Sequence, residues 1–156
     1  MAPATGSRAE RYGRIMEQLR ELLPKTDDSV ARMATVVAVI HHKMPHFFWT
    51  GFYRLVDGQL IVGPYQGSVA CSVLPGPQGV CWACLRRGES ILVPDVHAFS
   101  GHVACDPRSK SEVVVPVRER DGRVTGVLDV DSDKIAAFTA EDVVGLEGIV
   151  GLMVAD

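Results

Sequence analysis

Apolar residues recur at helical spacing in two segments near the start of the chain. In residues 7–23 they fall three and four positions apart, and Pro24 follows directly. Residues 29–43 show the same spacing with a wider apolar face, which is typical of a well-buried helix, and Pro45 closes the segment. Proline restricts the residue before it to extended conformations, so it marks a helix end. The pattern therefore predicts two helices.

The pattern then changes to the alternation that is typical of strands. Residues 47–56 and 59–64 flank Asp57-Gly58, a dipeptide that favours a two-residue hairpin turn. A second such dipeptide, Asp121-Gly122, lies between two further alternating segments. The remaining predicted elements are strands at 70–74, 90–93, 112–118 and 123–131, a short helix at 78–88 and a final helix that a Thr139–Asp142 capping pattern opens and that runs to about Val154.

This order of elements predicts the fold class. Two helices precede an antiparallel sheet, which a short helix and a loop interrupt, and a last helix closes the chain. We expect an α+β fold in which helices pack on the antiparallel sheet. The length of 156 residues fits one domain spanning residues 1–156. The polar segment 94–111 is longer than most loops inside compact domains, and such loops often carry function.

Composition and charge narrow the classes of partner. The chain is 47% apolar and 22% charged, which is typical of a globular protein. Its net charge is −3 and no basic stripe is visible, so we expect neither nucleic acid nor an anionic membrane surface as a partner. The first residues lack the apolar core of a signal peptide, and no apolar run is long enough to span a bilayer. We therefore expect a cytoplasmic location.

Three acidic residues fall on one face of the second predicted hairpin. A two-residue turn at Asp121-Gly122 places Glu112 opposite Asp131, and alternation places Asp129 on the same face. Like charges directly opposite each other destabilise a sheet, so folding alone gives no reason to gather them. The other cross-strand pairs in this register are Val114–Asp129, Pro116–Val127 and Arg118–Thr125.

Two interpretations of this acidic face stay open. It is either an ordinary solvated sheet face or part of a covered pocket. Apolar residues on the same face, Val114, Pro116 and Val127, favour the pocket, because the opposite face is clearly core. In a covered pocket, repulsion between the acids raises the pKa of at least one carboxyl group. That group would be available to donate a proton, or the cluster would receive a ligand ammonium group.

All four cysteines lie between residues 71 and 105. In a cytosolic chain such clustering indicates metal binding, redox chemistry or buried small residues. Cys81 and Cys84 form a CxxC pair at the start of the predicted helix 78–88, where the helix dipole lowers a thiol pKa. A zinc site would combine this pair with Cys71, Cys105 or a histidine, but a second closely spaced ligand pair is missing. A thioredoxin-like site would need a βαβ unit, which the predicted order lacks.

Cys105 differs from the other cysteines because it lies in the long polar loop. His102 precedes it, and Asp106-Pro107-Arg108 follows it. This polar setting suits a reactive thiolate, and an incidental loop cysteine is the alternative.

Trp49, Gly51 and Tyr53 share one face of the first predicted hairpin by alternation. Aromatic residues on a strand are usually core residues. The alternative is a binding site, because the glycine between the two rings leaves a gap that a small ligand could fill.

A series of short sequence words, in a fixed order, resembles a known family. The words are WTGFY at 49–53, GPYQG at 63–67, AC at 70–71, GVC at 79–81, VPDVH at 93–97, GHVACD at 101–106, SE at 111–112 and GVLDVD at 126–131. Together they resemble the free methionine-R-sulfoxide reductases, which are stand-alone oxidoreductases with the GAF fold. GVLD is common to GAF domains, whereas three cysteines at spacings of 10 and 24 are specific to this family.

The resemblance implies reduction of the R epimer of free methionine sulfoxide, a product of oxidative stress, with electrons from a thioredoxin-type protein and without a metal or cofactor. Cys105 matches the nucleophile, which becomes a sulfenic acid. Cys71 matches the resolving cysteine, which closes an intramolecular disulfide, and Cys81 matches a third, auxiliary cysteine. Trp82 and Cys84 depart from the family pattern beside Cys81. The family is often dimeric, so a homodimer is also implied.

The same resemblance assigns the substrate pocket. Trp49 and Tyr53 match aromatic residues that line it, and Glu112, Asp129 and Asp131 match its acidic cluster. We expect Glu112 with Asp131 to protonate the sulfoxide oxygen, because these two residues form the directly opposed pair. The main alternative is a non-catalytic GAF domain that senses a small molecule, although a sensor has no reason to carry the cysteine pair. A zinc-binding structural module is the third hypothesis.

Overall fold

The computed structural model describes residues 6–102 and 105–154, so the predicted domain 1–156 extends beyond the described residues at both ends. The helices are α1 (Arg8–Leu22), α2 (Ser29–Lys43), α3 (Val80–Arg87) and α4 (Ala140–Leu152), with short 3-10 helices at Leu23–Lys25 and Val96–Ala98. The strands are β1 (Trp49–Val56), β2 (Gln59–Gln66), β3 (Val73–Leu74), β4 (Ile91–Val93), β5 (Ser111–Arg118) and β6 (Val124–Ser132). The predicted α+β class and the order of elements are confirmed.

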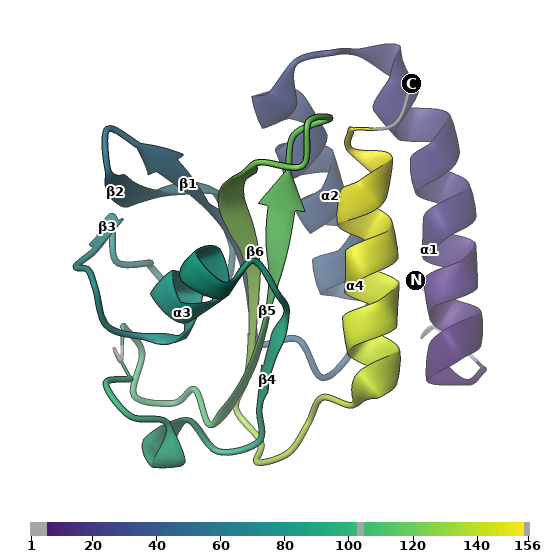
Figure 1. The fold of residues 1–156 in the computed structure, drawn as a ribbon. Coiled ribbons are helices and arrows are strands. Elements are labelled where there is room, and N and C mark those ends of the chain that lie inside the picture. Colours follow the sequence, from purple (N-terminus) through teal and green to yellow (C-terminus); the bar gives the residue numbers. More distant parts are fainter. Residues whose placement is uncertain (1–5, 103–104, 155–156) are drawn as a thin grey trace.

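One antiparallel sheet divides the described part of the chain into two layers. Its strand order is β3-β2-β1-β6-β5-β4. Helices α1, α2 and α4 cover one face, and α3 with the neighbouring loops covers the other (Figure 1). Each layer has its own hydrophobic cluster: Val113, Val115, Leu128 and Val130 face the three helices, whereas Val114 and Val127 face α3. Both faces of β5 and β6 are therefore buried, as a covered pocket requires.

The first hairpin has the predicted turn. Asp57 and Gly58 both adopt positive φ angles, 49° and 77°, as a two-residue turn matched to the twist of the strands requires. The strand predicted at 70–74 is shorter, because only Val73 and Leu74 pair with β2. Residues 67–72 instead form a loop, and this loop carries Cys71.

The second hairpin differs from its prediction at the turn and agrees with it at the acids. The Gly122 N–H donates to the Glu119 carbonyl over 2.9 Å, and Gly122 has a φ of 87°, so the loop has three residues and not two. Arg118 consequently pairs with Val124, and the predicted Arg118–Thr125 pair is wrong. A one-residue irregularity after Val117 then restores the register. The predicted pairs Glu112–Asp131, Val114–Asp129 and Pro116–Val127 are confirmed.

A buried carboxylate joins the helix layer to the start of the sheet. Asp142 accepts hydrogen bonds from the Tyr12 hydroxyl (2.7 Å), Arg8 Nη1 (2.7 Å) and the Thr139 N–H (2.9 Å), and it lies 2.9 Å from His46 Nε2. Burial raises the pKa of Asp142, but the hydrogen bonds, led by the one with His46, outweigh burial and lower it. Asp142 therefore ties α1, α4 and the segment before β1 together.

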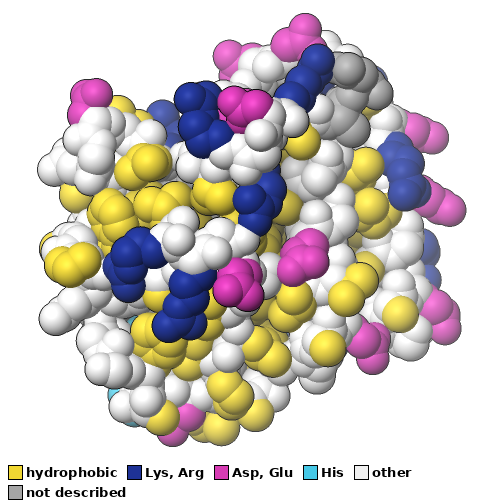
Figure 2. All heavy atoms as spheres, viewed as in Figure 1, with side chains coloured by type: hydrophobic (Ala, Val, Ile, Leu, Met, Phe, Trp, Pro, Cys, Tyr) yellow, Lys and Arg dark blue, Asp and Glu magenta, His cyan; other side chains and the backbone are white. Residues whose placement is uncertain are grey.

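Charged side chains of both signs are interspersed on the face shown in Figure 2, as the near balance of acids and bases in the sequence predicts. None of the described helices combines the length and apolar character needed to cross a bilayer.

Candidate active site

A cavity lies on the α3 side of the sheet, between β1, β5, β6, the start of α3 and the two loops that carry Cys71 and Cys105. The predicted site residues that line it are Trp49, Tyr53, Cys81, Cys105, Glu112, Asp129 and Asp131. Cys71 reaches the same place through its bond to Cys105. The fold thus brings these eight predicted site residues together, although 82 positions separate Trp49 from Asp131 in the sequence.

Three acids on β5 and β6 form a polar group in this cavity. Glu112 and Asp129 are 5% and 6% exposed, and Asp131 is half-buried. Burial is the largest cause that raises the pKa of each carboxyl group, and the charges of Asp129 and Asp131 raise that of Glu112 further. The interpretation as a solvated sheet face is therefore wrong. The cluster holds protons at pH values where an ordinary carboxyl group is ionised.

Two carboxylate oxygens of this cluster are left without a donor. Glu112 Oε1 and Asp129 Oδ1 are buried, and neither accepts a hydrogen bond from any described residue. Buried acceptors are almost always paired, because desolvation without a hydrogen bond is costly. These two atoms can therefore accept hydrogen bonds from a donor that enters the cavity.

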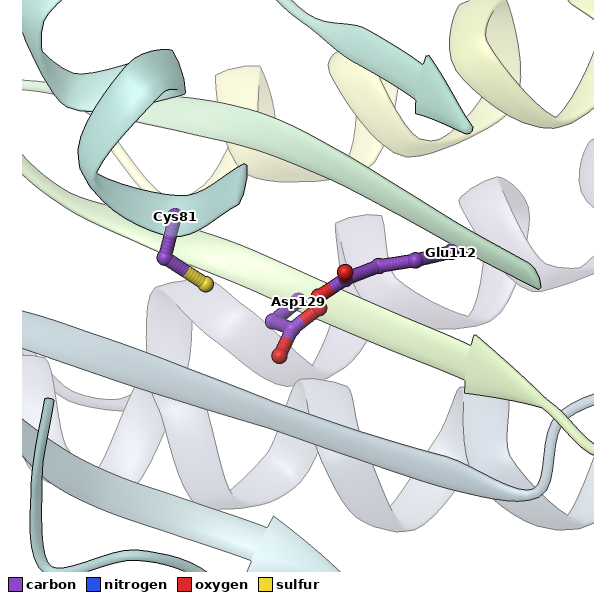
Figure 3. A group of neighbouring side chains, drawn as sticks. All are labelled: Cys81, Glu112 and Asp129. Carbon is purple, nitrogen blue, oxygen red and sulfur yellow. The ribbon is translucent and has the colours of Figure 1, made fainter. Parts of the chain in front are cut away.

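Cys81 points from the first turn of α3 toward Asp129 and Glu112 (Figure 3). One atom from each of these three side chains lies within 4.8 Å of the others, a sulfur and oxygen set that could hold a divalent cation. This set differs from the predicted zinc site, because Cys84 is not part of it. Burial, followed by the charges of the acids, raises the pKa of Cys81. The expectation that the helix dipole lowers this thiol pKa is wrong, since burial beside acids dominates.

Cys84 lies on the inner side of α3 as a buried small residue, which is one of the alternatives that the cysteine cluster left open. It is fully buried, and its Sγ lies 3.8 Å from the Val114 carbonyl oxygen. Burial raises the pKa of Cys84 to about 12, so it stays a thiol at neutral pH.

We expect Cys84→Ala to keep turnover with a thioredoxin-type donor within about twofold of wild type, and to lower the free energy of unfolding by about 1 kcal/mol. The loss comes from one small apolar group in a packed layer. Steady-state turnover and chemical denaturation measure the two effects. The alternative is a relay in which Cys81 and Cys84 pass electrons from thioredoxin to the Cys71–Cys105 disulfide. A fall in turnover with thioredoxin, without a fall in turnover with dithiothreitol, would establish that relay.

Cys71 and Cys105 form a disulfide, with their Cα atoms 5.6 Å apart. Cys71 lies in the loop after β2, and Cys105 lies in the loop before β5. Both are partly exposed, in contrast to the buried Cys81 and Cys84. This partly exposed pair is therefore placed to interconvert between a dithiol and a disulfide at the edge of the cavity.

Trp49 and Tyr53 line the cavity, and the ring of Tyr65 stacks beside them. Trp49 stacks against Tyr53 at 5.9 Å and against Tyr65 at 5.4 Å between ring centroids. The gap expected at Gly51 is not open to a ligand, because a Cβ there would lie 2.5 Å from the Trp49 ring and 2.4 Å from Tyr65 Cβ. Gly51 instead makes room for the protein's own stack. Sequence reasoning missed Tyr65, which the register places directly opposite Gly51.

The chain matches the GAF domain family over residues 29–155. It is also 35% identical over 144 residues to the free methionine-R-sulfoxide reductase of Escherichia coli, with 92% of this chain and 87% of that protein covered. The chain belongs to the free methionine-R-sulfoxide reductases. The resemblance drawn from the sequence and the GAF fold are both confirmed.

Solved structures agree with this assignment to the free methionine-R-sulfoxide reductases. The enzyme of Neisseria meningitidis, in complex with its substrate, is 34% identical, with a TM-score of 0.90 and coverage of 98% of this chain and 92% of that one. A putative GAF sensor protein from Burkholderia vietnamiensis is 41% identical, with a TM-score of 0.89 and coverage of 96% and 94%. As a free methionine-R-sulfoxide reductase, the protein is an oxidoreductase.

Proposed function

We propose that this protein reduces the R epimer of free methionine sulfoxide to methionine. The observation that carries the proposal is the shared cavity of Cys105 and the three acids Glu112, Asp129 and Asp131. Reduction of a sulfoxide needs both groups at once. A thiolate attacks the sulfoxide sulfur, while the oxygen must receive a proton because oxide is a very poor leaving group.

In the first step the substrate is reduced and Cys105 is oxidised. The Cys105 thiolate attacks the substrate sulfur and forms an S–S bond, and the protonated substrate oxygen leaves as water. Water then attacks Cys105 Sγ, the S–S bond breaks, and methionine leaves. The substrate sulfur gains two electrons, and Cys105 loses two and becomes a sulfenic acid. Glu112, opposite Asp131 and with a raised pKa, is our choice for the proton donor, a role that typically contributes about 10²–10⁴-fold.

In the second step Cys71 closes the cycle. Its thiol condenses with the Cys105 sulfenic acid to form the disulfide, and one water molecule leaves. A thioredoxin-type dithiol then reduces this disulfide by exchange and restores both thiols. Thioredoxin-type dithiols are kept reduced in the cytoplasm, so the proposal includes a cytoplasmic location. No metal or cofactor takes part in these steps, and a homodimer stays a prediction.

The remaining groups of the cavity fit a free amino acid. An ammonium group donates hydrogen bonds, and the unpaired Oδ1 of Asp129 can accept one. The ring of Trp49, stacked on Tyr53, offers an apolar surface for the substrate methyl group. When the substrate is held at its ammonium group and its methyl group, the sulfoxide oxygens of the two epimers point in different directions. This difference supports selection of one epimer.

We expect the free R epimer alone to be consumed when the protein is incubated with racemic methionine sulfoxide and dithiothreitol. The S epimer should remain, and methionine sulfoxide inside a peptide should not react at a comparable rate, since a peptide lacks the free ammonium group. Chiral chromatography follows both epimers. Comparable rates on a peptide contradict the proposed pocket. Binding of the R epimer without turnover by the reduced protein favours the GAF sensor instead.

A further inference from the structure

A hydrogen bond links the two cysteine loops independently of their disulfide. The Ser68 hydroxyl donates to Asp106 Oδ2 over 2.6 Å. Ser68 precedes Cys71 by three residues, and Asp106 directly follows Cys105. Since neither side chain carries sulfur, reduction of the disulfide does not remove either partner of this bond.

Asp106 is held firmly on its own loop. Arg108 donates to both of its oxygens, from Nε to Oδ1 at 3.0 Å and from Nη2 to Oδ2 at 2.8 Å, and the Arg108 N–H adds a bond of 2.9 Å to Oδ1. The Arg108 guanidinium in turn lies over the Phe48 ring, 4.9 Å from its centroid. The hydrogen bonds of Arg108, followed by that of Ser68, lower the pKa of Asp106. The acceptor is therefore ionised throughout the neutral range.

Ser68 is held on the opposite side by the ring of Trp49. Its carbonyl oxygen accepts a hydrogen bond from Trp49 Nε1 over 3.0 Å. The preceding Gly67 has a φ of 120°, and a Cβ there would lie 2.8 Å from the Trp49 ring and 3.0 Å from the Phe48 carbonyl oxygen. The loop that carries Cys105 thus contacts Phe48 through Arg108, and the loop that carries Cys71 contacts the adjacent Trp49 through Ser68.

We propose that Ser68 and Asp106 are positioning residues that hold the Cys71 loop against Cys105 for the closure of the disulfide. In that step the Cys71 thiol attacks the Cys105 sulfenic acid, the S–S bond forms, the S–O bond breaks, and water leaves. Two thiol groups held close together react at a high effective concentration, and loss of the link lowers it. The role in turnover rests on the proposed function.

The test compares Ser68→Ala with wild type in two measurements. In a glutathione redox buffer, the effective concentration of the Cys71–Cys105 pair should fall about tenfold, the order expected for one charge-assisted hydrogen bond. In a single turnover with the free R epimer, methionine should form at the wild-type rate within about twofold. Disulfide closure, followed by acid quench and alkylation, should slow about tenfold, and a dimedone adduct of Cys105 should accumulate.

Two further variants separate positioning from general stability. Ser68→Thr keeps the hydroxyl and should restore closure. Ser90→Ala removes a similar bond, 2.6 Å from the Ser90 hydroxyl to Glu147 Oε1 on another part of the surface, and should change neither measurement.

An unchanged glutathione equilibrium in Ser68→Ala overturns the positioning role, as does failure of Ser68→Thr to restore closure. The glutathione measurement needs no substrate. If wild type forms no methionine, the proposed function fails, and the equilibrium still decides whether the Ser68–Asp106 bond brings the two cysteines together.

Discussion

Cys105→Ser is expected to form no detectable methionine, whereas Cys71→Ser should form about one equivalent per protein and then stop. A serine hydroxyl is far too weakly acidic to replace the thiolate that attacks the sulfoxide. Without Cys71, the Cys105 sulfenic acid lacks its partly exposed partner 5.6 Å away between Cα atoms, so the enzyme stalls after one turnover. Methionine yield in a single-turnover assay without added thiol measures both variants.

Cys84→Ser serves as the control for this experiment, because it removes a thiol that is buried and lies outside the proposed cycle. Mass spectrometry of the stalled Cys71→Ser protein should show one added oxygen. A disulfide between Cys81 and Cys105 in that sample would show that the buried auxiliary cysteine resolves the sulfenic acid. Identical yields from the Cys105 and Cys71 variants would contradict the assigned roles.

Glu112→Gln and Asp131→Asn are expected to lower kcat/KM by roughly two to four powers of ten, the range for loss of a general acid. The wild-type rate should fall as the pH rises through the raised pKa of the carboxyl group that donates the proton, because only the protonated form does so. Rate profiles between pH 5 and about pH 9 on the free R epimer measure both effects. Asp133→Asn, an exposed acid just after β6, is the matched control.

The same substitutions should not lower stability. A carboxyl group whose pKa is raised on folding binds more protons in the folded state, so its contribution to stability is lost as the pH rises through the folded pKa. Replacing it with an amide removes that loss, and the melting temperature above neutral pH should stay equal or rise. Should activity disappear only because the variants unfold, the assignment of the general acid would be wrong.

The acidic cluster could be predicted from the sequence because a strand has a fixed period of two residues. The turn was predicted wrongly, yet the irregularity after Val117 returned the register before the strands reached Glu112 and Asp131. Register deep in a sheet is set by which residues are buried, so it survives a local error at a turn. The covered face was indicated by Val114 and Val127 on the acidic side, and the structure places both in the α3 layer.

Other features of the site depend on contacts between distant segments, which periodicity does not reveal. The fit of Trp49 over Gly51 depends on Tyr65 from the neighbouring strand. The bond between Ser68 and Asp106 joins residues 38 positions apart in two irregular loops. The pKa of Cys81 followed burial and nearby acids and not its place on a helix, and burial is a property of the whole fold.

The Asp142 carboxylate has a consequence for how sequences of this family diverge. Its donors come from α1, from the segment before β1 and from the cap of α4, so replacing any one donor side chain removes one hydrogen bond from the same carboxylate. Loss of the acid would leave both the Tyr12 hydroxyl and His46 without their hydrogen-bond partner, whereas loss of one donor leaves the other hydrogen bonds in place. Positions 8, 12, 46 and 142 are therefore expected to covary as a group, and the first helix to be inherited with the GAF domain that it precedes.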